Sequence, residues 1–206
     1  MERTPKSFTR KLKSLFTRGK TQRAYQRLVN TNATDLTKYK AAGSVFTDGK
    51  LILAGYQPKK RKPFISGIGG GKESGETYAD TAVRETLEEL FEFKEIPEKL
   101  TKEIQSEVVP QRVVQSASYV MVVYDFSGLE QILKLVKKHN LNSPLYDFIP
   151  TTLMDLLFKR KLDMSSTNLF FKPEISHLAL LPLVNHPRGT PFVDSYFIED
   201  MPLLLS

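Results

Sequence analysis

The sequence predicts one compact domain that mixes helices and strands, of the α/β or α+β class, preceded by a basic segment. Three observations support this prediction. Helix-like and strand-like runs alternate along the chain, no repeat or low-complexity tract interrupts them, and 206 residues with 40% hydrophobic content suit a single core. We therefore expect one domain with a modest appendage and no second full domain.

Residues 1–35 are predicted to form a basic helical extension. Thr4-Pro5 is typical of a helix start, and apolar residues then recur at helical spacing, namely Phe8, Leu12, Leu15 and Phe16. A second helical stretch is expected near residues 21–29. Residues 1–30 carry nine Lys or Arg and one acid, a charge of +8, whereas the whole chain sums to +7. This extension is expected to dock on the domain, to bind RNA phosphates or to lie on an anionic membrane.

The elements of the domain follow from alternation and periodicity. Residues 41–57 alternate around Asp48-Gly49 and predict a β-hairpin, and residues 63–68 predict a strand that leads into three glycines. Further along, a strand, two helices and a late buried strand are expected at residues 118–126, 128–139, 152–161 and 175–184, respectively.

Composition excludes several classes of protein. No apolar run approaches the roughly 20 residues of a membrane span, and the N-terminus lacks the apolar core of a signal peptide. We therefore expect a soluble intracellular protein without a transmembrane segment, in the cytoplasm or the nucleus. The absence of cysteine excludes disulfides, thiolate zinc sites and a cysteine nucleophile. With three histidines in the chain, a metal would be held mainly by oxygen ligands.

An acidic helix is expected after the glycines. Thr77 and Asp80 make a capping-box pattern, so a helix should begin at Tyr78. Four glutamates form a stripe opposite its apolar face, namely Glu85, Glu88, Glu89 and Glu92. Such a stripe is usually a solvated surface. Here, no Lys or Arg lies four residues after any of these acids, and a glycine-rich loop precedes the helix, so the stripe favours a Mg²⁺ or Mn²⁺ site.

The same stretch, residues 70–92, resembles the Nudix box. Six of the nine positions that this motif specifies are filled at the correct spacing, by Gly70, Glu76, Arg84, Glu85, Glu88 and Glu89. The resemblance implies a Nudix hydrolase domain over residues 36–206, an α/β/α sandwich with a mixed sheet, in which residues 128–171 form a helical insert. The basic extension and this insert also look like those of Nudix proteins of large DNA viruses, of the baculovirus type.

Three positions depart from the motif. Thr86 stands where an aliphatic residue is usual, Phe91 replaces the glycine that normally ends the helix, and Glu92 replaces an apolar residue. Phenylalanine does not readily adopt the left-handed backbone of a glycine cap. The helix is therefore expected to continue for another turn, with Phe93 as the apolar anchor.

The resemblance implies hydrolysis of a nucleoside diphosphate linked to another group, by attack of water on phosphorus with the help of Mg²⁺ or Mn²⁺. By this resemblance, the metal-binding and catalytic glutamates are Glu85, Glu88 and Glu89, and Glu76 would supplement the metal ligands. Arg84 would form a structural ion pair that positions the glutamates.

Substrate contacts are expected in the loop before the helix. There, Gly70 and Gly71 would let the backbone approach the phosphates, and Lys72 would contact a phosphate. Proteins of this family often recruit a further acid near a late strand as base or extra ligand, and Glu174 is the catalytic candidate here. His177 is the second candidate for this role, and Glu107, Asp125 and Glu130 are also compatible with it.

The motif does not specify the substrate, and three functions are compatible with it. Decapping of mRNA, by cleavage of the 5′ cap bridge, is favoured by the basic extension and by residues 59–62, which are all Lys or Arg and would contact RNA phosphates. The alternative within the enzyme class is an ADP-ribose or nucleotide-sugar pyrophosphatase. The alternative from another class is an inactive Nudix fold that binds nucleotide or RNA.

Overall fold

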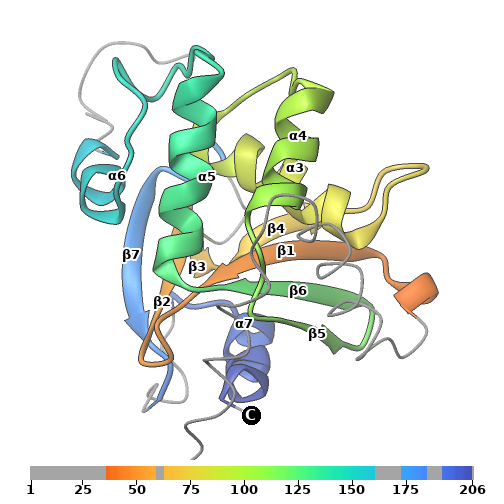
Figure 1. Cartoon of the computed structure of the whole chain (residues 1–206). Helices are drawn as coiled ribbons and strands as arrows, with labels where there is room; N and C mark the ends of the chain where they lie inside the picture. The colour runs from red at the N-terminus through yellow and green to blue at the C-terminus, as the bar shows by residue number, and fades with distance from the viewer. Residues whose placement is uncertain (1–35, 59–62, 161–172, 185–191, 206) are drawn as a thin grey trace, which may run out of the picture.

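The computed structural model describes residues 36–58, 63–160, 173–184 and 192–205 (Figure 1). The strands are β1 (Ala41–Phe46), β2 (Leu51–Gln57), β3 (Phe64–Ser66), β4 (Ile68–Gly71), β5 (Arg112–Ser116), β6 (Tyr119–Tyr124) and β7 (His177–Pro182). The helices are η1 (Leu36–Lys38), α3 (Tyr78–Phe91), α4 (Glu98–Glu107), α5 (Phe126–Lys138), α6 (Leu153–Lys159), α7 (Ser195–Asp200) and η2 (Met201–Leu204), of which η1 and η2 are 3-10 helices. The helices expected in the basic extension lie outside the described residues.

The strands form two sheets. β4, β1, β6 and β5 lie side by side in a four-stranded sheet, and β3, β2 and β7 form a three-stranded antiparallel sheet. In the larger sheet β1 runs parallel to β6, while the other neighbours are antiparallel. The expected α/β class with a mixed sheet is therefore confirmed.

The hairpin expected at residues 41–57 has the predicted strands and turn but not the predicted pairing. The chain reverses at Asp48-Gly49, and an isolated bridge joins Thr47 to Ile52. Otherwise β1 pairs with β4 and β6, whereas β2 pairs with β3 and β7. Both strands are buried along almost their whole length, so each needs backbone partners on both edges, which a two-stranded hairpin does not supply. The strand expected at residues 63–68 is likewise divided at Gly67 between the two sheets.

Helices cover both faces of the mixed sheet. Alternate side chains of β6 point to opposite sides, so that Val120 and Val122 join the core with α3 and α5, while Met121 and Val123 pack with Met201 of η2. Figure 1 shows the same arrangement, with α3, α4 and α5 on one side of the strands and α7 on the other. This layering is compatible with an α/β/α sandwich.

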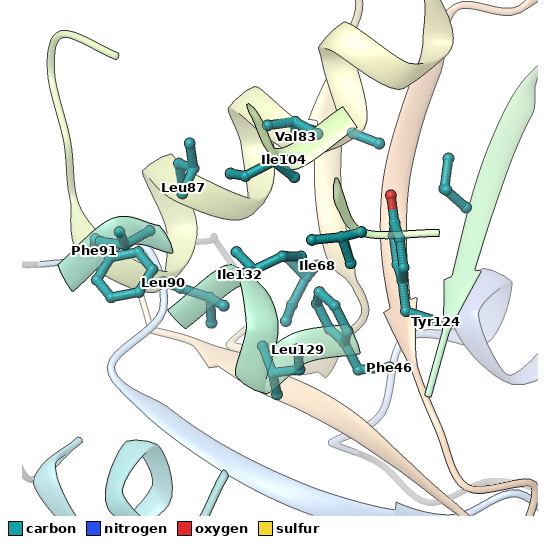
Figure 2. Close-up of a cluster of buried hydrophobic side chains, with 14 of the residues drawn as sticks. Phe46, Ile68, Val83, Leu87, Leu90, Phe91, Ile104, Tyr124, Leu129 and Ile132 are labelled. Atoms are coloured by element: carbon teal, nitrogen blue, oxygen red, sulfur yellow. The ribbon is translucent and has the colours of Figure 1, made fainter. Parts of the chain in front are cut away.

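The main core lies between α3, α5 and the mixed sheet (Figure 2). Leu87 and Leu90 of α3 and Leu129 of α5 are fully buried there, and Phe46 stacks on Tyr124 with 5.6 Å between ring centroids. Complete burial of one such side chain stabilises a fold by about 1.5–3 kcal/mol. The apolar face of α3 is therefore held firmly in the core, and this orientation determines where its acidic face points.

The later elements lie close to where the sequence predicts them. The expected helices at residues 128–139 and 152–161 correspond to α5 and α6, and the expected strands at residues 118–126 and 175–184 correspond to β6 and β7. Besides the two 3-10 helices, α4, β5 and α7 were not expected. β5 and α7 have no fully buried residues, so their apolar patterns are weak. α4 buries Leu100 and Ile104, four residues apart, and this helical spacing was missed.

The acidic helix ends earlier than expected. α3 ends at Phe91 and does not continue for a turn, because Glu92 itself adopts the left-handed conformation of a helix cap, with a φ of 55°. The Glu92 backbone N–H donates to the Glu88 carbonyl at 2.7 Å. Phe93 is buried and stacks on Phe91 with 5.2 Å between ring centroids, so it occupies the place of the expected apolar anchor.

Side chains from distant segments satisfy the remaining carbonyls at this helix end. Arg160 donates from Nη2 to the Glu89 carbonyl at 2.9 Å and from Nη1 to the Leu90 carbonyl at 2.6 Å. Ser143 donates from Oγ to the Phe91 carbonyl at 2.7 Å. Because these donors and the positive charge of Arg160 complement the negative end of the helix dipole, the helix stops without a glycine.

Candidate functional site

The acidic helix is anchored at its start as the sequence predicts. The Thr77 side chain accepts a hydrogen bond from the Asp80 backbone N–H at 3.2 Å, and the Asp80 side chain accepts one from the Thr77 backbone N–H at 2.9 Å. This is a complete capping box, and the helix begins at Tyr78. The capped start and the buried apolar face together fix the direction in which the glutamates of α3 point.

Arg84 forms ion pairs with two glutamates of the acidic stripe, Glu85 and Glu88, and with Glu76. Its Nε donates to Glu76 Oε1 at 2.7 Å, and its Nη1 donates to Glu85 Oε1 at 2.7 Å and to Glu88 Oε2 at 2.9 Å. Its Nη2 donates to the Gly71 carbonyl at 2.6 Å and to Glu76 Oε2 at 3.2 Å. The expectation that the glutamates have no cationic partner is therefore wrong. It considered only residues after each acid, whereas Arg84 lies four residues before Glu88.

Glu76 is engaged by its own loop and helix. Besides Arg84, its carboxylate accepts hydrogen bonds from the Thr81 hydroxyl at 2.8 Å and from the Glu73 backbone N–H at 2.9 Å. Burial by itself would raise the pKa of Glu76, but the hydrogen bonds outweigh it and hold the pKa below its ordinary value. Glu76 is therefore charged at neutral pH, and its ion pair with Arg84 holds the guanidinium in place.

A cleft of about 1030 Å³ opens beside the acidic helix. Its walls come from β3 and β4, from α3, from the turn between β5 and β6, and from α7. Among the described residues that line it are six carboxylates, namely Glu85, Glu88, Glu174, Asp194, Glu199 and Asp200, and no Lys, Arg or His. A cleft lined by one sign of charge attracts cations and opposes a bare phosphate group. A phosphorylated substrate would therefore have to bring positive charge with it.

The acids of the C-terminal segment were not expected in this cleft. Asp194 is the N-cap of α7, and its carboxylate accepts hydrogen bonds from the backbone N–H groups of Tyr196 and Phe197. The sequence Asp-Ser before an aromatic residue is a signal for such a helix start. It does not reveal that the segment folds back to the glycines of β4, which only the tertiary structure decides.

Glu85 and Glu88 each keep one carboxylate oxygen that has no hydrogen bond or ion pair within the described part of the chain. Arg84 holds Glu85 Oε1 and Glu88 Oε2, so these oxygens are Glu85 Oε2 and Glu88 Oε1. Burial raises the pKa of Glu85, against the opposing effect of Arg84, and the charges of Glu88 and Glu174 raise it further. Burial also raises the pKa of Glu88. Such crowded carboxylates are stabilised when a cation binds them.

Glu89 lies beneath the cleft and is only 2% exposed. Its Oε2 accepts a hydrogen bond from the Gly69 backbone N–H at 2.7 Å, and its Oε1 accepts one from the Gln57 amide at 3.2 Å. It is not among the described residues that line the cleft. The structure thus places Glu89 where it joins α3 to the glycine-rich strand β4 and to β2.

Glu174, the acid predicted from outside the motif, lines the cleft together with Glu85 and Glu88. The other candidates lie elsewhere. His177 contacts the Ser176 hydroxyl through Nδ1 at 2.9 Å, Asp125 caps α5, Glu130 accepts the Leu153 N–H, and Glu107 is exposed at the end of α4. None of these four lines the cleft. Of the candidate acids, Glu174 is therefore the one that the fold brings to the helix glutamates.

Of the three residues expected to bind substrate in the loop before α3, two lie in the cleft and one lies outside it. Gly70 and Gly71 line the cleft, whereas Lys72 does not. The Lys72 Nζ lies over the ring of Tyr39, 4.3 Å from its centroid, and this cation–π contact directs it away from the glycines. Gly70 also lies directly against the Glu85 carboxylate, because a Cβ there would lie 2.6 Å from Glu85 Oε1 and that side chain would have to move.

The cleft offers a partial set of oxygen donors for a divalent metal. Within the described ranges no group of three or more His, Asp or Glu residues lies close enough together to hold a metal ion. Glu85 Oε2 and Glu88 Oε1 nevertheless offer the two oxygen donors that Arg84 does not hold, and Glu174 is close enough to raise the pKa of Glu85. Mg²⁺ and Mn²⁺ prefer such oxygen donors and often take part of their coordination from water and substrate phosphates.

Comparison with known proteins leaves the family open. No protein-family model matches this sequence, and no curated protein sequence matches it. Two solved structures of a bifunctional NMN adenylyltransferase/ADP ribose pyrophosphatase from Francisella tularensis are similar to it. The first, complexed with AMP and a Mn ion, has 12% identity and a TM-score of 0.41 over 94% of this chain and 48% of that one. The second has 13% identity and a TM-score of 0.40 over 89% and 45%.

This chain therefore spans less than half the length of those two structures. A similarity this remote assigns neither a substrate nor a reaction to the protein. In the part of the chain that the structure describes, no helix is long and apolar enough to cross a lipid bilayer.

Proposed function

We propose that this protein is a divalent-metal-dependent hydrolase that cleaves the diphosphate link of a nucleoside diphosphate joined to another group. One observation carries the proposal. Glu85 and Glu88 of α3 and Glu174 of a segment 86 residues later line the same cleft beside Gly70 and Gly71. For Glu85 and Glu88 this arrangement agrees with the resemblance of residues 70–92 to the Nudix box, which assigns metal binding to Glu85, Glu88 and Glu89. Glu89 itself does not line the cleft.

The proposed metal site uses the oxygens that Arg84 leaves without a partner. Glu85 and Glu88 would hold Mg²⁺ or Mn²⁺, with Glu174 as a further ligand or as the base that takes a proton from water. A bound divalent ion would supply positive charge for the phosphate oxygens and acidify a water molecule. Arg84 keeps both helix glutamates in one orientation, and Gly70 and Gly71 leave space for the diphosphate.

Capped RNA is the substrate that we propose, with ADP-ribose as the alternative. The described lining of the cleft contains no cationic side chain, so RNA phosphates would be held elsewhere. The basic residues 1–30 and 59–62 would supply these contacts, and affinity for RNA would then fall steeply with salt. ADP-ribose hydrolysis would not need them.

The test compares the two substrates directly. Full-length protein with Mn²⁺ is given cap-labelled RNA or ADP-ribose, and initial rates of methylated guanosine diphosphate and AMP release are measured. The same rates are measured for a variant in which Arg10, Lys11 and Lys13 are replaced by Gln. Faster cap cleavage that this variant weakens supports decapping. Faster ADP-ribose cleavage that the variant leaves unchanged supports the alternative. Nucleotide binding without turnover of either substrate would contradict a hydrolase and favour a binding module.

Gly70→Ala should lower the activity, whereas Gly71→Ala should not. A Cβ at Gly70 would force the Glu85 carboxylate to move, but a Cβ at Gly71 would meet no atom within 4 Å. Because both glycines line the cleft, they form a matched pair. We expect kcat to fall about tenfold or more for Gly70→Ala, since small displacements of catalytic groups have effects of this size. Equal kcat values for the two variants, with equal unfolding midpoints, would contradict a role for Glu85.

A further inference from the structure

Glu92 stands where the motif has an apolar residue, and its backbone is strained. It is one of three non-glycine residues with positive φ in the described part of the chain. Glycine is the residue that adopts this conformation at least cost, so a helix end of this kind normally favours glycine. A glutamate at this position is therefore expected to make a side-chain contact that offsets the cost of its backbone conformation.

The Glu92 carboxylate makes such a contact. Its Oε1 accepts a hydrogen bond from the backbone N–H of Glu174 at 2.5 Å. This contact joins the end of α3 to a residue 82 positions later in the chain, the same one whose side chain lines the cleft. A hydrogen bond to an ionised acceptor is short and roughly twice as strong as a neutral one.

The residues that follow Glu174 are fixed by other contacts. Ile175 is fully buried and packs over Gly55, where a Cβ would lie 2.8 Å from its Cγ2. The Ile175 carbonyl accepts a hydrogen bond from Arg160, and the Ser176 backbone N–H donates to the Tyr56 carbonyl at 2.9 Å. Glu174 itself is exposed and lies outside the strands, and the Glu92 contact joins its backbone to the end of α3.

We propose that Glu92 is a positioning residue, whose carboxylate holds the Glu174 backbone so that the Glu174 side chain faces Glu85 and Glu88 across the cleft. This inference rests on the proposed function for the role of Glu174. It also explains the strained cap, because glycine would fit the backbone better but could not hold Glu174.

Two substitutions separate positioning from a purely structural role. Glu92→Gly removes the carboxylate and relieves the strained φ, so the midpoint of denaturant unfolding should stay the same or rise. Its kcat should nevertheless fall about 10- to 100-fold, with little change in KM, because the displaced group acts in the chemical step. Glu92→Gln keeps an oxygen acceptor of the same length and should keep kcat within about threefold, since a neutral acceptor is only weaker.

A double variant tests whether Glu92 acts through Glu174. If it does, Glu92→Gly should lower kcat much less in a Glu174→Gln background than in the natural chain, since coupled residues are not additive. Equal factors in the two backgrounds would overturn the proposal. A Glu174→Gln variant as active as the natural protein would also overturn it, while the proposed hydrolase function would stand.

A measurement without substrate separates this inference from the proposed function. Amide hydrogen exchange at Glu174 should be slow in the natural protein and in Glu92→Gln, and about tenfold or more faster in Glu92→Gly, because the N–H loses its acceptor. Unchanged protection in Glu92→Gly would overturn the positioning role even for a fully active enzyme. If Glu92→Gly loses protection at the Glu174 amide but the natural protein hydrolyses neither substrate, the contact between Glu92 and Glu174 is supported. The proposed hydrolase function is then rejected.

Discussion

Glu88→Gln is expected to lower kcat by about 100-fold or more, because losing a metal-binding carboxylate removes several kcal/mol of charge stabilisation. The fold should survive. Glu88 Oε2 accepts a hydrogen bond from Arg84, and a glutamine carbonyl can still accept it, while the second oxygen becomes an NH₂ group that cannot bind a cation. The Glu88 side chain is also 38% exposed, so its replacement leaves the core unchanged.

The measurement is kcat with Mn²⁺ on whichever substrate the natural protein cleaves, together with the Mn²⁺ affinity from calorimetry. Glu107→Gln is the matched control, because it makes the same chemical change on an exposed helix residue that does not line the cleft. Natural rates and natural Mn²⁺ affinity in Glu88→Gln would reject the proposed metal site.

Arg160→Met is expected to destabilise the protein by about 3 kcal/mol or more, because three carbonyls lose their donor and each unsatisfied buried group costs about 1–3 kcal/mol. Arg160 is 3% exposed, and its guanidinium donates to the carbonyls of Glu89, Leu90 and Ile175 and to the Tyr146 hydroxyl. Removing a buried charge and adding an apolar side chain offsets part of this loss. For a chain of this size the change corresponds to a fall in Tm of about 6–12 °C.

Urea unfolding of the natural and variant proteins measures this difference. Lys159→Met is the control, since it removes the same charge from the neighbouring exposed position of the same helix. It should change the free energy of unfolding by less than about 0.5 kcal/mol. If both variants unfold at the same urea concentration, Arg160 does not anchor the end of α3.

The sequence predicted those parts of the candidate site whose residues lie close together in the chain. The capping box at Thr77 and Asp80, the helix start at Tyr78 and the shared face of Glu85 and Glu88 depend on contacts within two helical turns. Local spacing therefore determines them. It also places Gly70 directly before the helix, although not against the Glu85 side chain.

Prediction from local spacing failed where side chains from several segments of the chain meet. Helix spacing alone missed Arg84 as the partner of Glu85 and Glu88, because pairing was sought in one direction along the helix, and only the resemblance to the Nudix box implied this ion pair. The end of α3 was placed too far on, because the donors that satisfy its last carbonyls come from Ser143 and Arg160, 52 and 70 residues away from the carbonyls that they reach. No pattern around residue 91 indicates them.

By itself, then, the sequence determined the class of fold, most strands and helices, and the acidic face of α3, because each depends on propensity and period over a few residues. The tertiary structure decided the rest. It separated β1 and β2 into two sheets, added the acids of the C-terminal segment to the cleft, and used Glu92 to join Glu174 to the helix glutamates. These outcomes depend on backbone hydrogen bonds and burial between segments far apart in the chain, and such contacts leave no periodic signal in the sequence.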